Sequence, residues 1–366
     1  MFSDRIQRLR ETFEINQIDA FFISNFYNVL YFAGFKTLTT DEREAFVLVT
    51  KKNTYLFTDG RYVHENFRLT ILNFKLALIE PGKGLFFHLQ NIITEEKITK
   101  IGIENEDIRL GEYDKFVKVL KGTSVIPIDK TGITIRENKE QEEIERIKKA
   151  CEITDECLKE IVPSVTVGMT EKKLAFNIEM WIKQKGHDLA FDPIVAVNKN
   201  SALPHYHTKD GKGIVEKESV ILIDFGVKFE DYMSDITRMV FMKPTSEMLT
   251  IYLQLLEVQE KSIRYVSLEK DPKAIDSYCR ELLKKKGLPN FSHSLGHGVG
   301  LEIHEYPKIS HLSDDHIVEN QVFTIEPGVY LSNRWGMRIE DTVVMKNGKA
   351  EVLTKYTKEP TIIKFK

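Results

Sequence analysis

Three of the chain's ten histidines, His293, His297 and His304, lie close together in the segment HSLGHGVGLEIH. Glycines occupy alternate positions from Gly296 to Gly300, so little side-chain bulk separates the rings. Glycine lets the backbone approach another group closely, and imidazole serves both as a metal ligand and as an acid–base group. The glycine spacing differs from the GxGxxG pattern of a phosphate-binding loop. Taken alone, the segment is either a glycine-rich turn or a candidate metal or catalytic site.

A first pair of carboxylates, Asp224 and Asp235, occurs on two apolar segments in SVILIDFGVKFEDYMSDITRMVFM. The continuous apolar run 220–223 is typical of a strand buried on both faces. If the two segments form a hairpin centred in KFED, the two aspartates are expected directly opposite each other, with Cβ atoms ~5 Å apart. Two carboxylates so close among apolar residues repel each other and are poorly solvated unless they bind a cation.

A second pair, Glu326 and Glu340, occurs in VFTIEPGVYLSNRWGMRIEDTVVM. A hairpin centred on Asn333, in the polar segment SNRWG, would place these glutamates opposite each other as well. Four carboxylates and the imidazole of His297 form a hard, oxygen-rich ligand set, which predicts a binuclear site for Mn²⁺, Co²⁺ or Fe²⁺, with Zn²⁺ as a further option. Each residue alone is more often a strand cap, a turn residue or a structural histidine. The prediction depends on their conjunction between residues 224 and 340.

The elements that must position these residues indicate an α/β (α+β) fold with two domains. Apolar runs such as AFFI and AFVLVT alternate with amphipathic segments in the first part, which predicts a mixed sheet with helical cover. Later segments predict helices with an apolar stripe from Ile144 to Ile161 and over 171–185, 247–267 and 274–287. The predicted boundary separates an N-terminal domain, residues 1–130, from a C-terminal domain, residues 131–366, which carries the candidate site.

Composition limits the classes of function. The chain has 366 residues and a net charge of -3, which gives no reason to expect a nucleic acid or an anionic membrane as partner. It shows no apolar run of 18 residues and no signal-peptide core, so no membrane span is expected. Three cysteines, without a CxxC pair, favour a reducing cytoplasm over a disulfide scaffold.

The segments IDFG, SDITR, HSLGHGVGLEIHE, IEPGVY and RIEDT, in this order, resemble the motifs of the pita-bread metallopeptidases, which include methionine aminopeptidase, aminopeptidase P and prolidase. TDGRY and the α/β character of the first part also resemble the N-terminal domain of the prolidase and creatinase branch. The resemblance covers essentially the whole chain. It implies a creatinase-type N-terminal domain and a pita-bread catalytic domain, in which two pseudo-symmetric αββ halves clasp a dinuclear metal centre.

The resemblance implies five metal ligands: Asp224, Asp235, His297, Glu326 and Glu340. Asp235 and Glu340 would bridge the two ions. Asp224 would chelate one ion, while His297 and Glu326 would complete the other. Two such ions hold a bridging water and lower its pKa, so that hydroxide forms near neutral pH and attacks the peptide carbonyl. Glu326 would carry a proton from the water to the leaving nitrogen.

By the same resemblance, His304, His293 and His205 would lie on the substrate side and bond the scissile carbonyl or the tetrahedral intermediate. His205 lies 19 residues before Asp224, two more than expected for close relatives, so His207 stays open as an alternative.

Two further side chains are candidates. Arg338 lies two residues before Glu340 and would share its face on a strand, so we expect it to orient the acids through Tyr330. Lys308 follows the HE motif, where dipeptidase members usually carry an arginine that binds the free substrate carboxylate. Lys308 therefore favours a dipeptidase.

The prolidase branch implies a homodimeric metallo-exopeptidase that cleaves peptides with proline at the second position, either as an Xaa-Pro dipeptidase or as an Xaa-Pro aminopeptidase. The bond before proline lacks an N–H, and the ring fixes φ. A non-catalytic pita-bread binding module and a creatinase-like hydrolase without metal are the alternatives, and the complete ligand set disfavours both. The N-terminal domain disfavours a methionine aminopeptidase.

Overall fold

The computed structural model describes residues 2–63 and 73–363 and divides the chain into two units, the first ending at Arg136 and the second beginning at Glu137. This division falls six residues after the predicted position, 130, because helix α6 (Thr131–Glu137) is bonded to the first unit. Arg136 Nη1 donates to Asn28 Oδ1 over 3.0 Å, and the Tyr31 hydroxyl reaches the carbonyl of Ile135 over 3.4 Å.

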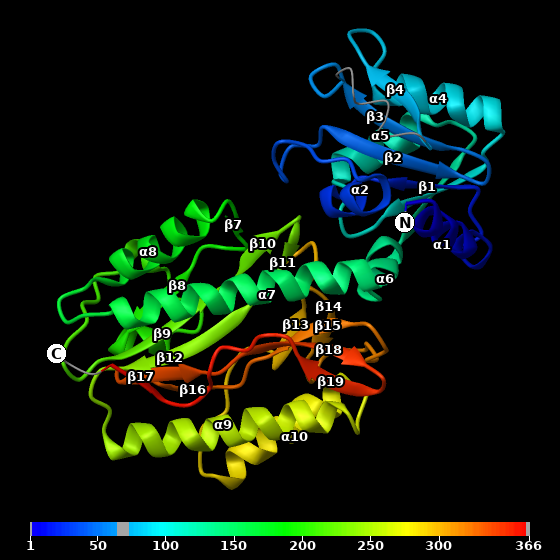
Figure 1. The fold of residues 1–366 in the computed structure, drawn as a ribbon. Helices are drawn as coiled ribbons and strands as arrows, with labels where there is room; N and C mark the ends of the chain where they lie inside the picture. The colour runs from blue at the N-terminus through cyan, green and yellow to red at the C-terminus, as the bar shows by residue number, and fades with distance from the viewer. Residues whose placement is uncertain (1, 64–72, 364–366) are drawn as a thin grey trace. The chain divides into compact units, whose positions relative to one another are not determined.

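The first unit is built on a mixed six-stranded sheet in the order β4-β3-β2-β1-β5-β6. Its elements are α1 (Phe2–Ile15), β1 (Ala20–Ile23), α2 (Phe26–Ala33), β2 (Ala45–Thr50), β3 (Thr54–Asp59), β4 (Lys75–Ile79), α4 (Leu85–Glu96), β5 (Lys100–Glu104), α5 (Leu110–Val119) and β6 (Ser124–Ile128). Helices α4 and α5 pack on the face that carries Ala20, Phe22 and Leu48, while α1 and α2 lie on the other side of the sheet (Figure 1). The predicted mixed sheet with helical cover is confirmed.

The second unit repeats one arrangement twice, a pair of helices followed by antiparallel strands. The first half contains α7 (Gln141–Ile161), α8 (Glu171–Gln184), β7 (Asp188–Leu189), β8 (Ile194–Val197), β9 (Val220–Phe225), β10 (Val227–Phe229), β11 (Tyr232–Met233) and β12 (Ile236–Phe241). The second half contains α9 (Ser246–Val266), α10 (Pro272–Lys285), β13 (Gly296–Gly298), β14 (Glu305–Ile309), β15 (Val322–Ile325), β16 (Gly328–Leu331), β17 (Trp335–Arg338), β18 (Asp341–Lys346), β19 (Lys349–Val352) and β20 (Thr361–Ile362). The strands lie between the two helix pairs (Figure 1).

Strand β9 is buried along its whole length, as its apolar run predicted. Ile221 and Ile223 pack into the core under α7 and α8, whereas Val220 and Leu222 pack into the core that α9 and α10 share. Asp224 continues the second series, because side chains alternate along a strand. The acids of the first half therefore point toward the second half.

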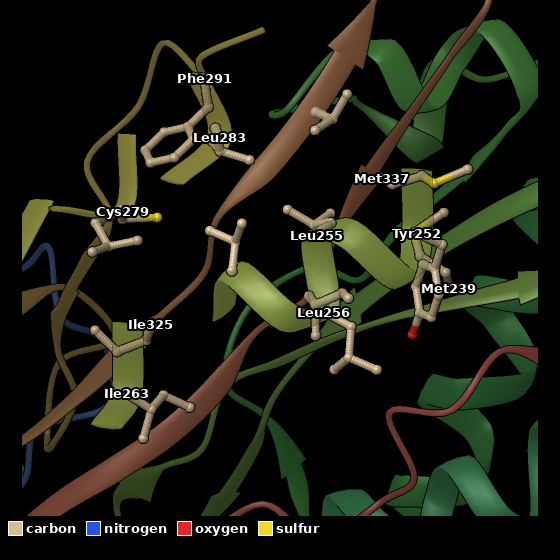
Figure 2. Packing of buried hydrophobic residues seen from close by; sticks show 14 of the residues in the cluster. Met239, Tyr252, Leu255, Leu256, Ile263, Cys279, Leu283, Phe291, Ile325 and Met337 are labelled. Atoms are coloured by element: carbon tan, nitrogen blue, oxygen red, sulfur yellow. The ribbon is translucent and has the colours of Figure 1, made fainter. Parts of the chain in front are cut away.

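The core beneath α9 and α10 fixes the strands of the second half. Figure 2 shows Leu255, Leu256 and Ile263 of α9 packed with the neighbouring core residues. Ile325 of β15 belongs to this core, so the next residue, Glu326, points to the opposite face, toward the first half.

The first acidic hairpin differs from its predicted register. Asp224 lies opposite Thr237, and Asp235 lies two residues earlier on that strand, so the aspartates share a face diagonally rather than directly opposite each other. The cause is the turn. Lys228 pairs with Met233 and Phe229 with Tyr232, which leaves Glu230 and Asp231 as a two-residue loop, both with positive φ (45° and 70°). Positive φ at both central positions is the mark of a type I′ turn.

The second acidic hairpin has its predicted register. Ile325, the residue before Glu326, pairs with Asp341, the residue after Glu340. On the other side of the glutamates, Gly328 pairs with Arg338. Continuing this pairing sets Glu326 opposite Glu340, with Asn333 in the loop.

The helix predictions are also confirmed. Helix α8 begins after the Thr170 cap, whose hydroxyl accepts from the Lys173 N–H, and ends before Gly186. Helix α10 ends in Lys284 and Lys285, and Gly287 follows with a φ of 72°. Among the helices of the described residues, none combines the length and apolar character that crossing a membrane requires.

Candidate metal centre

The structure brings the five predicted ligands together from the central strands of both halves. Asp224 lies near the end of β9, Asp235 precedes β12, and His297 lies in β13. Glu326 and Glu340 lie between the strand segments of the second hairpin. Ligand atoms of Asp235, His297 and Glu340 all lie within 4.8 Å of one another.

His297 is held in the tautomer that leaves one nitrogen for a metal. Its Nδ1 lies 3.0 Å from the carbonyl of Gly298, so Nδ1 carries the proton and donates it. Nε2 lies 3.5 Å from Asp235 Oδ2 and 3.5 Å from Glu326 Oε1. Burial lowers the pKa of His297 to about 3, so the ring is neutral at physiological pH. A neutral imidazole whose other nitrogen is bonded to a carbonyl is the usual form of a metal-binding histidine.

Two carboxylate oxygens in the cluster are buried without a hydrogen-bond partner: Asp224 Oδ1 and Asp235 Oδ1. Buried polar atoms are nearly always paired, because an unpaired one has lost its water without compensation. Cations between these oxygens would supply the missing partners, so the residues present fit a divalent metal site.

The cluster also carries more negative charge than its surroundings neutralise. Burial, together with the neighbouring carboxylates, raises the pKa values of Asp235 and Glu340 well above the ordinary range. Burial raises the pKa of Glu326 to about 8, against the opposing effect of Arg338. Burial is also the main cause that raises the pKa of Asp224. Bound cations would favour the ionised form of all four acids.

The glycines around His297 are explained by close backbone contacts. A Cβ on Gly296 would lie 1.9 Å from the carbonyl oxygen of Thr324, and one on Gly298 would lie 2.2 Å from that of Tyr306. Any side chain at either position would push β13 away from β14 or β15. The alternating glycines therefore keep His297 at the acids.

Arg338 contacts the acids more directly than the sequence predicted. Its Nη2 donates to Asp224 Oδ2 over 2.5 Å, so it does not act through Tyr330 alone. Nη1 donates to the Tyr330 hydroxyl over 3.0 Å, and Nε donates to Thr237 Oγ1 over 3.0 Å. The Thr237 hydroxyl in turn donates to Glu340 Oε2 over 2.7 Å. Sequence reasoning missed Thr237, although its position two residues after Asp235 placed it on the same face.

The three predicted substrate-side histidines have different surroundings. His304 is exposed, and its ring lies 4.3 Å from that of His297 between centroids. His293 is already bonded at both nitrogens. Nδ1 donates to the Ser294 carbonyl over 2.7 Å, and Nε2 accepts from the Tyr330 hydroxyl over 2.9 Å. Burial lowers the pKa of His293 to about 4, which keeps Nε2 an acceptor.

His205 and His207 both lie on an exposed loop and line a cavity of about 480 Å³ with Phe191 and Ile194. His205 directly follows Pro204, whose carbonyl accepts from Nη1 of Arg338, the residue that also donates to Asp224.

Lys308 is exposed and pairs with His297 across β13 and β14. The Lys308 ammonium lies 5.2 Å from the centre of the Tyr306 ring, and the backbone N–H of Lys308 donates to Asp315 Oδ2.

Comparison with known proteins assigns this fold and cluster to a class. Residues 5–138 match the Creatinase/Prolidase N-terminal domain, and residues 145–347 match Metallopeptidase family M24. The two matches together define a metallopeptidase with an additional N-terminal domain. The chain belongs to metallopeptidase family M24, and its second unit has the pita-bread fold, as the sequence predicted.

Relatives cover nearly the whole chain. The Xaa-Pro dipeptidase of Pyrococcus furiosus is 32% identical over 97% of this chain and 99% of its own length. Among solved structures, the Xaa-Pro dipeptidase from Bacillus anthracis superposes with a TM-score of 0.91 at 29% identity, covering 99% of this chain and 100% of that one. The X-Pro aminopeptidase from Thermotoga maritima superposes with a TM-score of 0.85 at 34% identity, covering 96% and 100%.

Proposed function

We propose that this metallopeptidase hydrolyses the Xaa-Pro bond at the N-terminus of short peptides, using two divalent ions. The observation that carries the proposal is the buried cluster of four carboxylates and a neutral imidazole, two of whose oxygens have no partner among the described residues. The substrate class is supported by relatives named Xaa-Pro dipeptidase and X-Pro aminopeptidase, which align along nearly their full length.

We assign the ligand roles as follows. Asp235 and Glu340 would serve both ions, as the resemblance to the family implies, and their ligand atoms lie within 4.8 Å of each other and of His297. His297 and Glu326 would hold one ion, and Asp224 would hold the other. We assign Mn²⁺ or Co²⁺ rather than a thiolate-preferring ion, because the cluster offers oxygen and imidazole.

When bound, the two cations would lower the pKa of a shared water and polarise the scissile carbonyl. Glu326 would be the group that carries a proton from the attacking water to the leaving nitrogen. Thr324 Oγ1 lies 3.3 Å from Glu326 Oε1 and helps to hold the carboxyl in place.

The histidines divide into two roles. We propose that the exposed rings of His304 and His205 contact the substrate carbonyl and the tetrahedral intermediate. Each such donor is worth about 3 kcal/mol of transition-state stabilisation. His293 acts on Tyr330 instead, since both of its nitrogens are already engaged.

Lys308 is assigned to the free carboxylate of a dipeptide substrate. It lies on the strand beside His297 and is exposed. We further propose a cytoplasmic homodimer. The location is supported by three free, buried cysteines, since a reducing compartment keeps cysteines free.

The test uses protein stripped with a chelator, reloaded separately with Mn²⁺, Co²⁺ or Zn²⁺, and assayed on Ala-Pro, Ala-Pro-Ala and Ala-Ala. We expect metal-dependent cleavage of the proline substrates and little cleavage of Ala-Ala. Cleavage of Ala-Pro alone identifies a dipeptidase, and cleavage of both proline substrates identifies an aminopeptidase.

A matched control is the Asp188→Asn variant, which removes an exposed carboxylate that is paired with Lys183 and is not among the proposed ligands. It should keep full activity. Failure of the wild-type protein to cut any of the three peptides with any metal would overturn the proposed function and favour a binding module.

A further inference from the structure

The loop that carries His205 has little regular structure of its own. Between β8 and β9 it contains two short 3₁₀ turns, at 198–202 and 208–210, and a single β-bridge from Ile214 to Thr170. His205 itself is exposed, so its ring is not held by packing on all sides. Something outside the loop must therefore fix the position of this histidine relative to the acids.

Glu171, the first residue of α8, is 0% exposed, and its carboxylate accepts hydrogen bonds from several positions along this segment. Oε1 accepts from the N–H of Val197 over 2.6 Å and from Asn200 Nδ2 over 2.9 Å. Oε2 accepts from the Tyr206 hydroxyl over 2.9 Å and from the N–H of Gly213 over 2.8 Å. The four donors come from both ends and the middle of the loop.

The chain makes room for this carboxylate with glycines. A Cβ on Gly213 would lie 2.3 Å from the Glu171 carboxyl carbon, and a Cβ on Gly211 would lie 2.6 Å from Glu171 Oε2. Helix geometry also favours a negative side chain here, because the N-terminus of α8 carries a partial positive charge. The site is thus shaped around an acceptor with four bonds.

His205 lies between two anchors. Before it, the carbonyl of Pro204 accepts from Arg338 Nη1 over 3.2 Å, and Arg338 is the residue that holds Asp224. After it, Tyr206 is held by Glu171. Near the start of the loop, Ser201 Oγ accepts from the Gly336 N–H of β17 over 2.8 Å. The loop is therefore fastened to the metal hairpin on one side and to Glu171 on the other.

We propose that Glu171 is a positioning residue for the reaction, which acts through Tyr206 to hold the imidazole of His205 at the substrate side of the metal cluster. This inference rests on the proposed function, because it assigns His205 a contact with the substrate. Glu171 itself touches neither the substrate nor the cations.

The test is a double-mutant cycle. Glu171→Gln keeps the size of the side chain, but its amide NH₂ replaces an acceptor oxygen and faces groups that themselves donate hydrogen bonds. His205→Ala removes the group that Glu171 is proposed to position. The two single variants, the double variant and wild type are loaded with Mn²⁺ and assayed on Ala-Pro, and bound metal is counted for each. Glu160→Gln, on the exposed side of α7, is the control.

We expect His205→Ala to lower kcat clearly, and Glu171→Gln to lower kcat by about 10-fold or more, since misplacement of a reacting group by about 1 Å can cost about 100-fold. Metal content and KM should stay within about twofold of wild type. In the His205→Ala background the Glu171→Gln change should cost less than about twofold. Non-additivity of this kind shows that the two residues act as one unit.

Two outcomes would overturn the inference. One is an equal fold loss from Glu171→Gln in both backgrounds, which would mean a general effect on the fold. The other is a His205→Ala variant with full kcat. If Glu171→Gln fails to fold, Tyr206→Phe removes only the hydroxyl, which donates to Glu171 and accepts from Asn200, and should show the same non-additivity with a smaller loss.

Amide hydrogen exchange separates this inference from the proposed function. In Glu171→Gln we expect faster exchange in segment 198–213 and unchanged exchange in β13 and β15, whatever the substrate. If wild type cleaves no Xaa-Pro peptide but the exchange pattern appears, the proposed function fails and the positioning of the loop stands. Unchanged exchange in the loop would contradict the positioning directly.

Discussion

Glu340 and Asp341 are consecutive buried residues with opposite electrostatic surroundings, 2% and 0% exposed. Glu340 faces the other three acids of the cluster, and burial and its neighbours Glu326 and Asp224 raise its pKa well above the ordinary range. Asp341 faces the other way. Burial alone would raise its pKa as well, but the cations of Arg238 and Lys358 outweigh that effect and lower it.

The hydrogen bonds of Asp341 explain the contrast. Arg238 Nη2 donates over 2.7 Å, and Lys358 Nζ, Gln259 Nε2 and Thr354 Oγ1 each donate over 2.9 Å. This carboxylate needs nothing from outside the chain. The cluster around Glu340 has four carboxylates and one buried guanidinium, so it is complete only with bound cations. The contacts of Asp341 therefore stabilise the fold, whereas the side that carries Glu340 faces the candidate metal site.

The largest expected effect is on activity. Asp235→Asn removes one of the proposed metal ligands, so we expect kcat on Ala-Pro to fall by at least about 1,000-fold, because bound ions supply several kcal/mol of transition-state stabilisation. Metal content, measured by mass spectrometry on dialysed protein, should fall with it. A variant that keeps both ions and most of its activity would remove Asp235 from the ligand set.

Asp341→Asn should act on stability instead. It leaves the buried guanidinium of Arg238 and the half-buried ammonium of Lys358 without their carboxylate, which costs about 3–5 kcal/mol of unfolding free energy. Urea unfolding should show the same loss with chelator and with saturating Mn²⁺. A loss that appears only with Mn²⁺ would place Asp341 in the metal site and erase the contrast.

The pH dependence of stability should also differ between the two sides. For Glu326 the folded-state pKa, about 8, exceeds its ordinary value, so the folded protein binds more protons than the unfolded chain between these values. Stability without metal therefore falls as pH rises, by up to about 1.4 kcal/mol per pH unit for each such group. We expect chelated protein to melt higher at pH 6 than at pH 8. With saturating Mn²⁺ this slope should flatten, because cations replace the protons.

Thr237→Val tests the hydroxyl that joins Arg338 to Glu340. Both partners would lose a hydrogen bond in a buried site, worth about 1–3 kcal/mol. We expect kcat to fall by about 10-fold while the protein stays folded, as judged by circular dichroism. Thr250→Val, on the exposed side of α9, is the matched control and should change neither.

The smallest expected effect is at Lys308. An exposed ammonium contributes about 1 kcal/mol or less, so Lys308→Ala should raise KM for Ala-Pro by about 3- to 5-fold and leave kcat unchanged. Ala-Pro-Ala should be affected less, since its carboxylate lies one residue further away. Equal effects on both peptides would argue against the assigned role.

The sequence predicted the second acidic hairpin better than the first for a physical reason. The polar segment around Asn333 marks the centre of its loop, so the pairing of Glu326 with Glu340 follows. In the first hairpin the turn is made by Glu230 and Asp231 with positive φ, a conformation that glycine or asparagine usually signals. The predicted centre of the first hairpin was therefore off by one residue, although Asp224 and Asp235 do share one face of the sheet as predicted.

Partners of the acids were harder to predict than the acids. Thr237 looks like any strand threonine, and Glu171 looks like any acid in the first turn of a helix. Their roles depend on which distant groups they meet, such as Arg338 and Tyr206. The end of the first unit was also hard to predict, because α6 is tied to that unit by contacts between residues far apart in sequence, such as Arg136 with Asn28 and Ile135 with Tyr31.

The most direct test of the account is the melting temperature of chelator-treated wild type and Asp235→Asn, each with and without Mn²⁺, at pH 7.5. Removing one of four crowded carboxylates should make the metal-free variant melt higher than the metal-free wild type. Mn²⁺ should raise the wild-type melting temperature by about 5 °C or more and leave the variant nearly unchanged. A wild-type protein that does not respond to Mn²⁺, or a metal-free variant less stable than wild type, would contradict the claim that this cluster is built around cations.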